Sequence, residues 1–589
     1  MARLFRILCL VAAAGTIAVA ADAQRTSTPR GAPPQTPPTV QRQPLRPGPP
    51  VWEIGRIAKF ACPALVKLRL PGAEILSSSE VMGPSFTPPG AATEQNLPPF
   101  CRVVGRAFPT RASNIMFEVW LPLKNYNDRY EQAGNGGFAG IINYSGIAEG
   151  VRRGFASAST DDGHQGQIDG SFALGPPAKI VDFGWRSLKA TTDAAKSIVQ
   201  AFYGAQAKYA YFFGCSDGGR EAMMEAQRFP TDFDGIIAAA PANNWTHQFT
   251  ALAYNTQAAY NPTTFAQVLP QSLLGVLAGG VRKQCAGHDG GLPGDLYLTD
   301  PRACVIDWTK IQCQASQNPA TCLDAAQVAA VQAIYAGAKN STGTFYEGYE
   351  PGSEDAAGTW QPWITGPGNI PNFFNFGLQT AFGEGFFAYF VFKTYPTNLF
   401  TLDMNTALGQ ADAFAPDLNA MDPDLSAFHA HGGKLIQYAG WADPAVAPRG
   451  SIDYYEAVRT AMAASYAQQQ DWYRLFMAPG MGHCAGGPGP DAFGNVPAAP
   501  APAGQGDAGH DVLMALMRWR ENGAAPAKII ATHYQNDDAM GGAGAVEFQR
   551  PLCPYPALPR YSGIGLGKDA GSYACEAHVR TKLDGKLLK

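Results

Sequence analysis

The feature that most constrains the fold is a serine flanked by glycines at the junction of an expected strand and an expected helix. Gly214-Cys215-Ser216-Asp217-Gly218 follows the apolar, β-prone run 209–213 (YAYFF) and precedes the helix-like run 219–228 (GREAMMEAQR). Small residues at these positions permit a strained turn that presents the serine hydroxyl at the carboxyl edge of a sheet. With 65 glycines in the chain the pentapeptide alone is a weak signal, so its place between strand and helix carries the prediction.

The order of expected elements around this turn favours a parallel sheet. Residues 115–123 (IMFEVWLPL) form a β-prone run, residues 187–203 have the apolar spacing of a helix, and residues 209–213 form the next strand. Strand, helix and strand in succession are typical of α/β proteins with a parallel sheet. Two later runs, 434–438 (KLIQY) and 472–477 (WYRLFM), predict further strands.

Because a neutral serine is a poor nucleophile, a general base is expected, and α/β-hydrolases place an acid and then a histidine after the serine. Asp443 follows the run 434–438 in Gly440-Trp-Ala-Asp-Pro444, and His483 follows the run 472–477 in Pro479-Gly-Met-Gly-His-Cys484. Alone, such an Asp is usually a turn residue and such a His usually solvated. Their order and their places past strand ends predict a triad of Ser216, His483 and Asp443.

The other histidines and an early glycine cluster complete the candidate site. His429, His431, His510 and His533 are rivals for the base, but none follows a strand in the expected register. His164 precedes the serine, so we expect it only to line a pocket. An oxyanion would be bound by the backbone N–H groups of Asp217 and Gly137, although without the triad residues 134–137 would indicate a plain turn.

Composition divides the chain into a leader, a tether and a folded part. Arg3, Arg6 and the apolar stretch 7–21 resemble a secretory signal, with Ala21-Asp22-Ala23 as the cleavage site and a retained anchor as the lesser alternative. The following segment is rich in proline and cannot bury enough apolar area to fold. We therefore expect a signal peptide (1–23), a disordered linker (24–50), a first hydrolase part (51–244), a lid domain (245–425) and a second hydrolase part (426–589).

Charge and cysteine content limit the partners and the compartment. The net charge of −4 comes without long runs of one sign, which predicts no nucleic acid or membrane partner and favours a small neutral ligand. Removing Cys9 with the leader leaves ten of the 11 cysteines in a periplasmic or secreted protein. Five disulfides are expected over buried free thiols, with the connectivity left open.

These motifs together resemble the tannase and feruloyl esterase family, which includes mono(hydroxyethyl) terephthalate hydrolase. The resemblance covers residues 62–575 and is most specific at 214–220 (GCSDGGR), 228–235 (RFPTDFDG), 440–443 (GWAD), 479–484 (PGMGHC) and 551–555 (PLCPY). It implies an α/β-hydrolase fold with a large inserted lid. It also implies the disulfide pairs Cys62 with Cys101, Cys215 with Cys484, Cys285 with Cys304, Cys313 with Cys322, and Cys553 with Cys575.

The same resemblance bears on metal and substrate. Relatives bind structural calcium between the cysteines that match Cys285 and Cys304, but two matching Asp positions here are Ala286 and Pro293. Asp289, Asp295 and Asp300 are the remaining candidate calcium ligands, since calcium prefers several anionic oxygens. No cofactor is expected for the chemistry itself.

Relatives that act on a substrate with a free carboxylate hold it with a lid arginine, and no arginine occurs between Arg302 and Arg449. The lid instead carries many aromatic residues that either form its core or stack on an aromatic acyl group. These residues are Phe373, Phe374, Phe376, Phe382, Phe386, Phe387, Tyr389 and Phe390.

The sequence thus predicts a secreted serine esterase that hydrolyses esters of aromatic, phenolic acids such as hydroxycinnamates or gallates through an acyl-enzyme. The alternatives are a hydrolase of aromatic dicarboxylate half-esters of the terephthalate type and, from another class, an exported binding protein on an inactive hydrolase scaffold. The second alternative requires a broken triad, whereas all three positions are filled.

Overall fold

The computed structural model describes residues 59–166, 169–366, 376–502, 504–537, 541–542 and 544–577. The expected signal peptide and linker, together with Phe373 and Phe374, lie outside these residues. Residues Arg56–Lys589 cluster as one compact unit. Within the described ranges, no helix combines the length and the apolar character needed to cross a bilayer.

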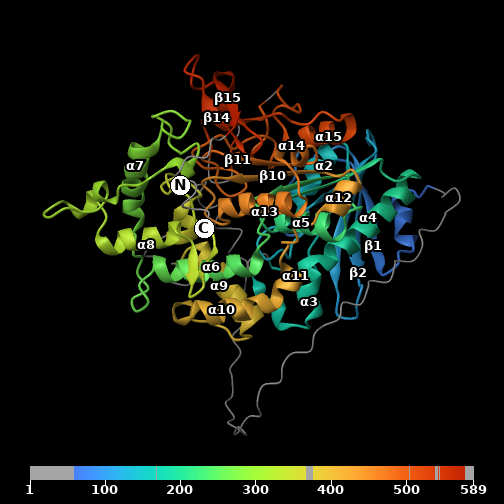
Figure 1. The fold of residues 1–589 in the computed structure, drawn as a ribbon. Helices are drawn as coiled ribbons and strands as arrows, with labels where there is room; N and C mark the ends of the chain where they lie inside the picture. Colours follow the sequence, from blue (N-terminus) through green and yellow to red (C-terminus); the bar gives the residue numbers. More distant parts are fainter. Residues whose placement is uncertain are drawn as a thin grey trace, which may run out of the picture. The chain divides into compact units, whose positions relative to one another are not determined.

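A nine-stranded mixed sheet forms the centre of this unit (Figure 1). The strand order is β1-β2-β3-β5-β4-β6-β7-β10-β11. The pairs from β1 to β5 are antiparallel, and all pairs from β5 to β11 are parallel. The strands are β1 (Ala73–Val81), β2 (Phe100–Ala107), β3 (Ile115–Pro122), β4 (Arg129–Ala133), β5 (Ala156–Thr160), β6 (Tyr209–Cys215), β7 (Gly235–Ala239), β10 (Lys434–Gly440) and β11 (Tyr473–Ala478).

The expectation that the run 115–123 belongs to the parallel sheet was wrong. It forms β3, which is antiparallel to both β2 and β5. The strand that leads into the glycines at 134–137 is instead β4, whose sequence RYEQA contains two residues of types that are depleted in strands, Glu131 and Ala133. Its polar side chains are nonetheless mostly buried between flanking layers, which only the assembled sheet could reveal.

Helices cover both faces of the sheet because successive strand residues point to opposite sides. Phe212 and Ile236 pack with α4, α5 and α13 on one face, and Tyr211 and Ile237 pack with α15 on the other. Near the antiparallel strands, α2 packs on Phe100 and Trp120. These helices are α2 (Tyr144–Arg152), α4 (Ser187–Tyr203), α5 (Asp217–Arg228), α13 (Pro448–Ala461) and α15 (Val512–Asn522).

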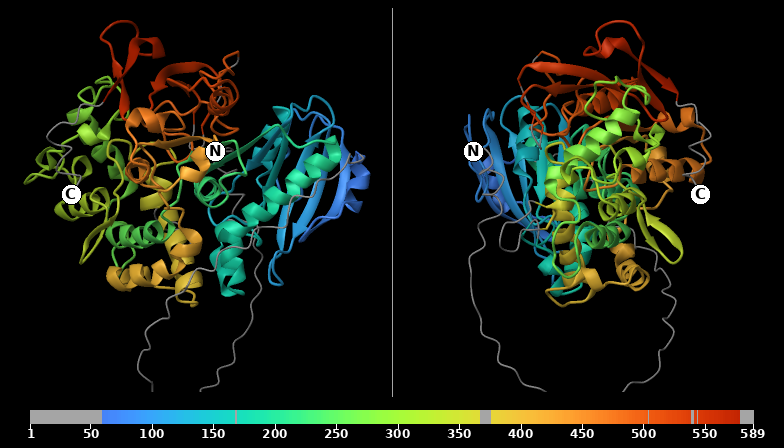
Figure 2. Two further views of the ribbon diagram at one scale, coloured as in Figure 1. Left: turned by 45° about the vertical axis from the view of Figure 1, so that its right-hand side comes forward. Right: turned by 90° about the vertical axis from the view of Figure 1, so that its left-hand side faces the viewer.

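A long insertion separates the adjacent strands β7 and β10. Figures 1 and 2 show most of its helices grouped beside the sheet, at the end away from β1 and β2. Its elements are α6 (Trp245–Ala259), α7 (Leu274–Cys285), α8 (Ala325–Tyr335), β8 (Ala338–Asn340), β9 (Gly343–Tyr346), α9 (Leu378–Gly385), α10 (Met404–Ala411), α11 (Ala415–Leu418) and α12 (Ser426–Ala430). The remaining elements are α3 (Ala178–Val181), α14 (Tyr466–Gln470), β12 (Ile529–Tyr534), β13 (Val546–Leu552), β14 (Ala557–Tyr561) and β15 (Tyr573–Ala577).

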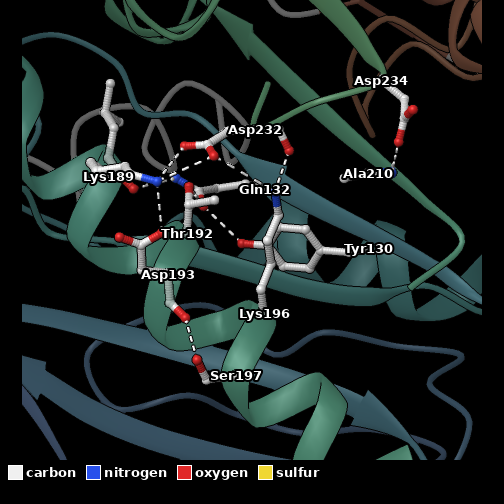
Figure 3. A network of polar contacts seen from close by, with 11 residues as sticks. Tyr130, Gln132, Lys189, Thr192, Asp193, Lys196, Ser197, Ala210, Asp232 and Asp234 are labelled. Atoms are coloured by element: carbon white, nitrogen blue, oxygen red, sulfur yellow. Dashed lines mark hydrogen bonds and ion pairs between the residues drawn. The ribbon is translucent and has the colours of Figure 1, made fainter. Parts of the chain in front are cut away.

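A polar network fastens α4 to the segment before β7, near the amino ends of β6 and β7 (Figure 3). Lys189 Nζ donates to Asp193 Oδ1 at 2.7 Å and to Asp232 Oδ2 at 3.0 Å. Asp234 accepts a hydrogen bond from the backbone N–H of Ala210, where β6 begins. The contact between Asp234 and Ala210 therefore fixes β6 at the end opposite to Ser216.

Candidate active site

Ser216 lies in a sharp turn between β6 and α5. β6 ends at Cys215, α5 begins at Asp217, and Ser216 between them has φ 67° and ψ −121°. A non-glycine residue in this region of φ and ψ is strained, and such strain persists only where the surroundings hold it. Here Ser216 N–H donates to Ala239 O at 3.0 Å and Ala242 N–H donates to Ser216 O at 3.1 Å, which fixes the turn against the end of β7.

The glycines around Ser216 are required by close backbone packing. A Cβ atom on Gly214 would lie 2.2 Å from the carbonyl oxygen of Gly218, and one on Gly219 would lie 2.2 Å from that of Ala239. Both distances are far below van der Waals contact, so side chains at these positions would push the helix off the sheet. The sequence pattern thus has a direct steric cause.

Asp443 and His483 meet in the loops that follow β10 and β11. His483 Nδ1 lies 2.9 Å from Asp443 Oδ2. The other carboxylate oxygen of Asp443 accepts the backbone N–H groups of Ala445 and Val446 at 2.8 and 3.0 Å. Since Asp443 is 2% exposed and so well held, it orients the imidazole with Nδ1 as donor and leaves Nε2 to face another group.

A disulfide joins the two loops that carry Ser216 and His483. Cys215 and Cys484 are bonded with their Cα atoms 6.0 Å apart, and each is the immediate chain neighbour of one of these residues. The structure therefore brings the predicted serine close to the pair of His483 and Asp443. It also forms the other four pairs that the resemblance implied.

The pocket beside Ser216 has one polar wall and one apolar wall. Gly137, Ser216 and Asp217 line it from the sheet side. The N–H of Asp217 is at the start of α5, where the first N–H groups of a helix have no acceptor within the helix. The rest of the lining consists of Gln248, of the small or branched residues Ala242, Ala445 and Val446, and of the large apolar side chains Trp245, Phe249, Leu252, Trp363 and Phe382.

Most of the lid aromatic residues that were predicted and that the structure describes do not line the pocket. Of those that the structure describes, Phe382 lines it, whereas Phe386, Phe387 and Phe390 are fully buried in the lid core. The sequence argument missed Trp245, Phe249 and Trp363. The spacing of Trp245, Phe249 and Leu252 marks one face of α6 and could have drawn attention to it, but no local signal singles out Trp363.

Trp363 links the lid to the candidate base. Its ring meets the imidazole of His483 edge-on, with centroids 5.2 Å apart, and stacks on Phe382 at 6.1 Å. The apolar wall therefore begins directly at His483.

The rival histidines are engaged elsewhere. His429 stacks on Trp472, His510 pairs with Asp507, His533 pairs with Asp537, and His431 is exposed. His164 stacks on Phe172 with ring centroids 3.6 Å apart, and its Nε2 faces the carbonyl of Phe138. Burial lowers the pKa of His164 to about 4, so it stays neutral, and it is absent from the described lining of the pocket.

The predicted calcium ligands do not fit a calcium site. Asp295 faces the guanidinium of Arg550 at 3.2 Å and accepts the N–H of Leu292 at 2.8 Å. Asp289 accepts the N–H groups of Thr299 and Gly291. Asp300 pairs with Arg302. Calcium needs several free anionic oxygens directed to one point, whereas these oxygens already have donors and point to separate partners.

Comparison with known proteins gives concordant results. A family model described as "Tannase and feruloyl esterase" matches residues 101–576. An uncharacterised esterase of Xanthomonas campestris pv. campestris is 39% identical over 545 residues, which is 88% of this chain and 91% of that protein. "Feruloyl esterase C" of Talaromyces stipitatus is 32% identical over 82% of this chain and 87% of its own. The crystal structure of feruloyl esterase B from Aspergillus oryzae superposes with a TM-score of 0.78 at 28% identity, covering 87% of this chain and 99% of that one.

Proposed function

This chain belongs to the tannase and feruloyl esterase family and is a carboxylic ester hydrolase, and we propose that it hydrolyses esters of phenolic acids through Ser216. The observation that carries the proposal is the hydrogen bond between His483 and Asp443 in a loop covalently tied to the turn of Ser216. The names of the curated relatives support hydroxycinnamates, with gallates as the neighbouring class. The substrate is a small molecule that fits between aromatic walls.

The proposed reaction proceeds through an acyl-enzyme. Ser216 Oγ attacks the ester carbonyl carbon while His483 Nε2 takes its proton, and Asp443 stabilises the resulting imidazolium. The N–H groups of Gly137 and Asp217 bind the oxyanion. His483 then returns the proton to the departing alcohol, and a water molecule repeats these steps to release the acid and free Ser216.

The apolar wall supports an aromatic acyl group. Phe249, Trp363 and Phe382 offer ring faces and edges to a planar acid, and such contacts contribute about 0.5–1.5 kcal/mol each beyond area burial. The part of the lining that the structure describes contains no Lys or Arg, so it offers no cation for a terephthalate carboxylate. Terephthalate-type half-esters are therefore the second candidate.

We also propose that the protein is exported. Five disulfides tie the described chain, and such bonds form and persist in oxidising compartments. The leader-like residues 1–23 support the same proposal.

The test is a substrate panel with purified protein. Methyl ferulate, methyl gallate, a terephthalate half-ester and short nitrophenyl esters are compared by kcat/KM, because discrimination between substrates lies in that ratio. We expect methyl ferulate or methyl gallate to give the highest value, and a fluorophosphonate probe to label the wild type but not Ser216→Ala. Preference for the half-ester would favour the second candidate, and absence of labelling would point to a binding protein.

A further inference from the structure

Three carboxyl groups are buried directly beneath the turn of Ser216. Asp162, Asp217 and Glu221 are at most 1% exposed, and one oxygen from each lies within 4.8 Å of the others. Asp217 is neutralised by Arg220, whose Nε lies 2.6 Å from Asp217 Oδ1. The Nη1 and Nη2 groups of Arg220 donate to the carbonyls of Gly184 and Phe183. Asp162 and Glu221 therefore form a second pair without a cation of their own.

Asp162 and Glu221 each have one carboxyl oxygen without a donor. Asp162 Oδ1 accepts the hydroxyl of Ser187 at 2.7 Å, and Glu221 Oε2 accepts the backbone N–H of Asn135 at 2.9 Å. The remaining oxygens, Asp162 Oδ2 and Glu221 Oε1, are buried without a donor, and the two carboxyl groups lie close together. Two carboxyl oxygens can form a hydrogen bond only when one of them carries a proton.

Burial assigns that proton to Glu221. Loss of solvation raises the pKa of Glu221 well above its ordinary range, and the nearby charge of Asp162 raises it further. Burial also raises the pKa of Asp162, to about 7, and the interaction with Glu221 opposes part of that rise. Glu221 is thus a neutral carboxylic acid that donates to Asp162 and accepts from Asn135.

Asn135 stands in the loop that carries Gly137, and three contacts hold it. Besides the bond to Glu221, its carbonyl accepts the N–H of Gly218 at 2.9 Å and its side-chain Nδ2 donates to Thr160 O at 2.8 Å. Glu221 and Gly218 both belong to the first turns of α5, which also begins with Asp217. The helix that supplies one oxyanion donor therefore also holds the loop that supplies the other.

We propose that Glu221 is a positioning residue whose protonated carboxyl, bonded to Asp162, clamps the Asn135 peptide and so sets the distance between the N–H groups of Gly137 and Asp217. The proposal rests on the proposed function, because it concerns the stabilisation of the ester-derived oxyanion. A neutral acid suits this position, since a second negative charge under the oxyanion would oppose the charge that develops above it.

The experiment compares three variants in the same methyl ester assay. Glu221→Ala removes the clamp, whereas Glu221→Gln keeps both bonds, because its amide oxygen accepts from Asn135 and its amide nitrogen donates to Asp162. Glu225→Ala is the matched control, since Glu225 lies one turn further along α5 and is equally buried, with its charged neighbours Asp232 and Lys196 away from the loop of Gly137. Thermal unfolding of each variant is measured in parallel.

We expect Glu221→Ala to lower kcat by about 10- to 100-fold with little change in KM, somewhat less than loss of a whole oxyanion donor. Glu221→Gln should stay within about threefold of the wild type, a difference of less than 1 kcal/mol in barrier. Glu225→Ala should match the wild type in kcat while losing thermal stability. The infrared difference spectrum of the wild type minus Glu221→Gln should show the band of one buried protonated carboxyl, which separates Glu221 from other buried acids such as Glu225.

Four results would overturn the proposal. Glu221→Ala could have the same kcat as Glu225→Ala. Glu221→Gln could be as slow as Glu221→Ala, which would mean that Glu221 has to be ionised. The infrared difference spectrum could lack the carboxyl band. A stoichiometric metal ion that the wild type holds and Glu221→Gln lacks would mean that a cation, and not a proton, joins the acids. Ser216→Ala in the same assay distinguishes failure of this proposal from failure of the proposed function. Full turnover by Ser216→Ala would contradict the proposed function. An inactive Ser216→Ala together with a fully active Glu221→Ala would contradict only the positioning role of Glu221.

Discussion

The two walls of the pocket are built in different ways. On the sheet side, Ser216 and His483 are held by a strained turn, backbone hydrogen bonds and the disulfide between Cys215 and Cys484. On the lid side, Trp363 and Phe382 contact the pocket through ring packing alone. The first wall fixes the atoms that we propose to react, whereas the second offers apolar surface to the substrate. Changes on the sheet side should therefore abolish turnover, whereas changes on the lid side should alter substrate preference.

The largest effect is expected on the sheet side, from the proposed triad. Ser216→Ala or His483→Ala should each lower kcat by at least about 10³-fold, and the double variant should be little worse, because the groups act as a unit. Asp443→Asn should cost somewhat less. Steady-state kinetics on the best methyl ester measure this, and near-normal turnover by Ser216→Ala would contradict the assignment.

The next effect tests whether the covalent tie matters for rate. Cys215→Ser/Cys484→Ser should lower kcat by about 10- to 100-fold, since a displacement of about 1 Å between reacting groups costs roughly that much. The bridge also closes a sequence separation of 269 residues, so the variant should lose up to a few kcal/mol of stability.

The lid supplies the matched control for this variant. Cys313→Ser/Cys322→Ser removes a bridge of separation 9 on the lid side and should leave kcat near the wild type. Equal losses of kcat in both double variants, measured below their unfolding temperatures, would show that disulfides act here through general stability.

The apolar wall can be tested by adding a free carboxylate to the acyl ring of the substrate. Because the described lining has no Lys or Arg, kcat/KM should fall at least about tenfold relative to the neutral methyl ester of the same acid, which corresponds to about 1.4 kcal/mol. Competition between a terephthalate half-ester and the diester measures it. Faster cleavage of the half-ester would reveal a cation supplied from elsewhere in the chain.

A smaller effect should follow from trimming the lid wall. Phe382→Leu should raise KM for an aromatic ester by about 3- to 10-fold with kcat nearly unchanged, since one ring contact contributes about 0.5–1.5 kcal/mol. Phe400→Leu is the control, because Phe400 contacts Phe265 and Phe376 in the lid outside the described lining of the pocket. A fall in kcat with unchanged KM would mean that Phe382 acts on the catalytic wall.

The smallest effect is expected from removing divalent cations. Since Asp295 pairs with Arg550, and Asp289 and Asp300 have their own donors, chelation with EDTA should leave the Tm unchanged. Differential scanning calorimetry with EDTA and with added calcium measures this. A fall in Tm that calcium reverses would show that the lid loop needs a metal ion despite these contacts.

Local sequence patterns predicted the structure where the steric requirement involves residues close together in the chain. A Cβ atom on Gly214 would lie 2.2 Å from the carbonyl oxygen of Gly218, only four residues along the chain, so the glycine pattern predicted the strand, the turn and the helix. The strand β4 was missed because its sequence RYEQA is polar and its burial comes from flanking layers. Likewise, the pocket-lining rings that were missed come from α6 and from Trp363, whose positions depend on how the lid packs.

By itself the sequence determined the α/β-hydrolase class, the family, and the loops in which Ser216, Asp443 and His483 stand. It could do so because each is tied to its own strand end by spacing along the chain. Only the tertiary structure decided which aromatic residues wall the pocket, that Arg550 faces Asp295, and that the carboxyl groups of Asp162 and Glu221 are buried together without a cation of their own. Those outcomes depend on desolvation and on contacts between residues far apart in sequence, and no local pattern encodes either one.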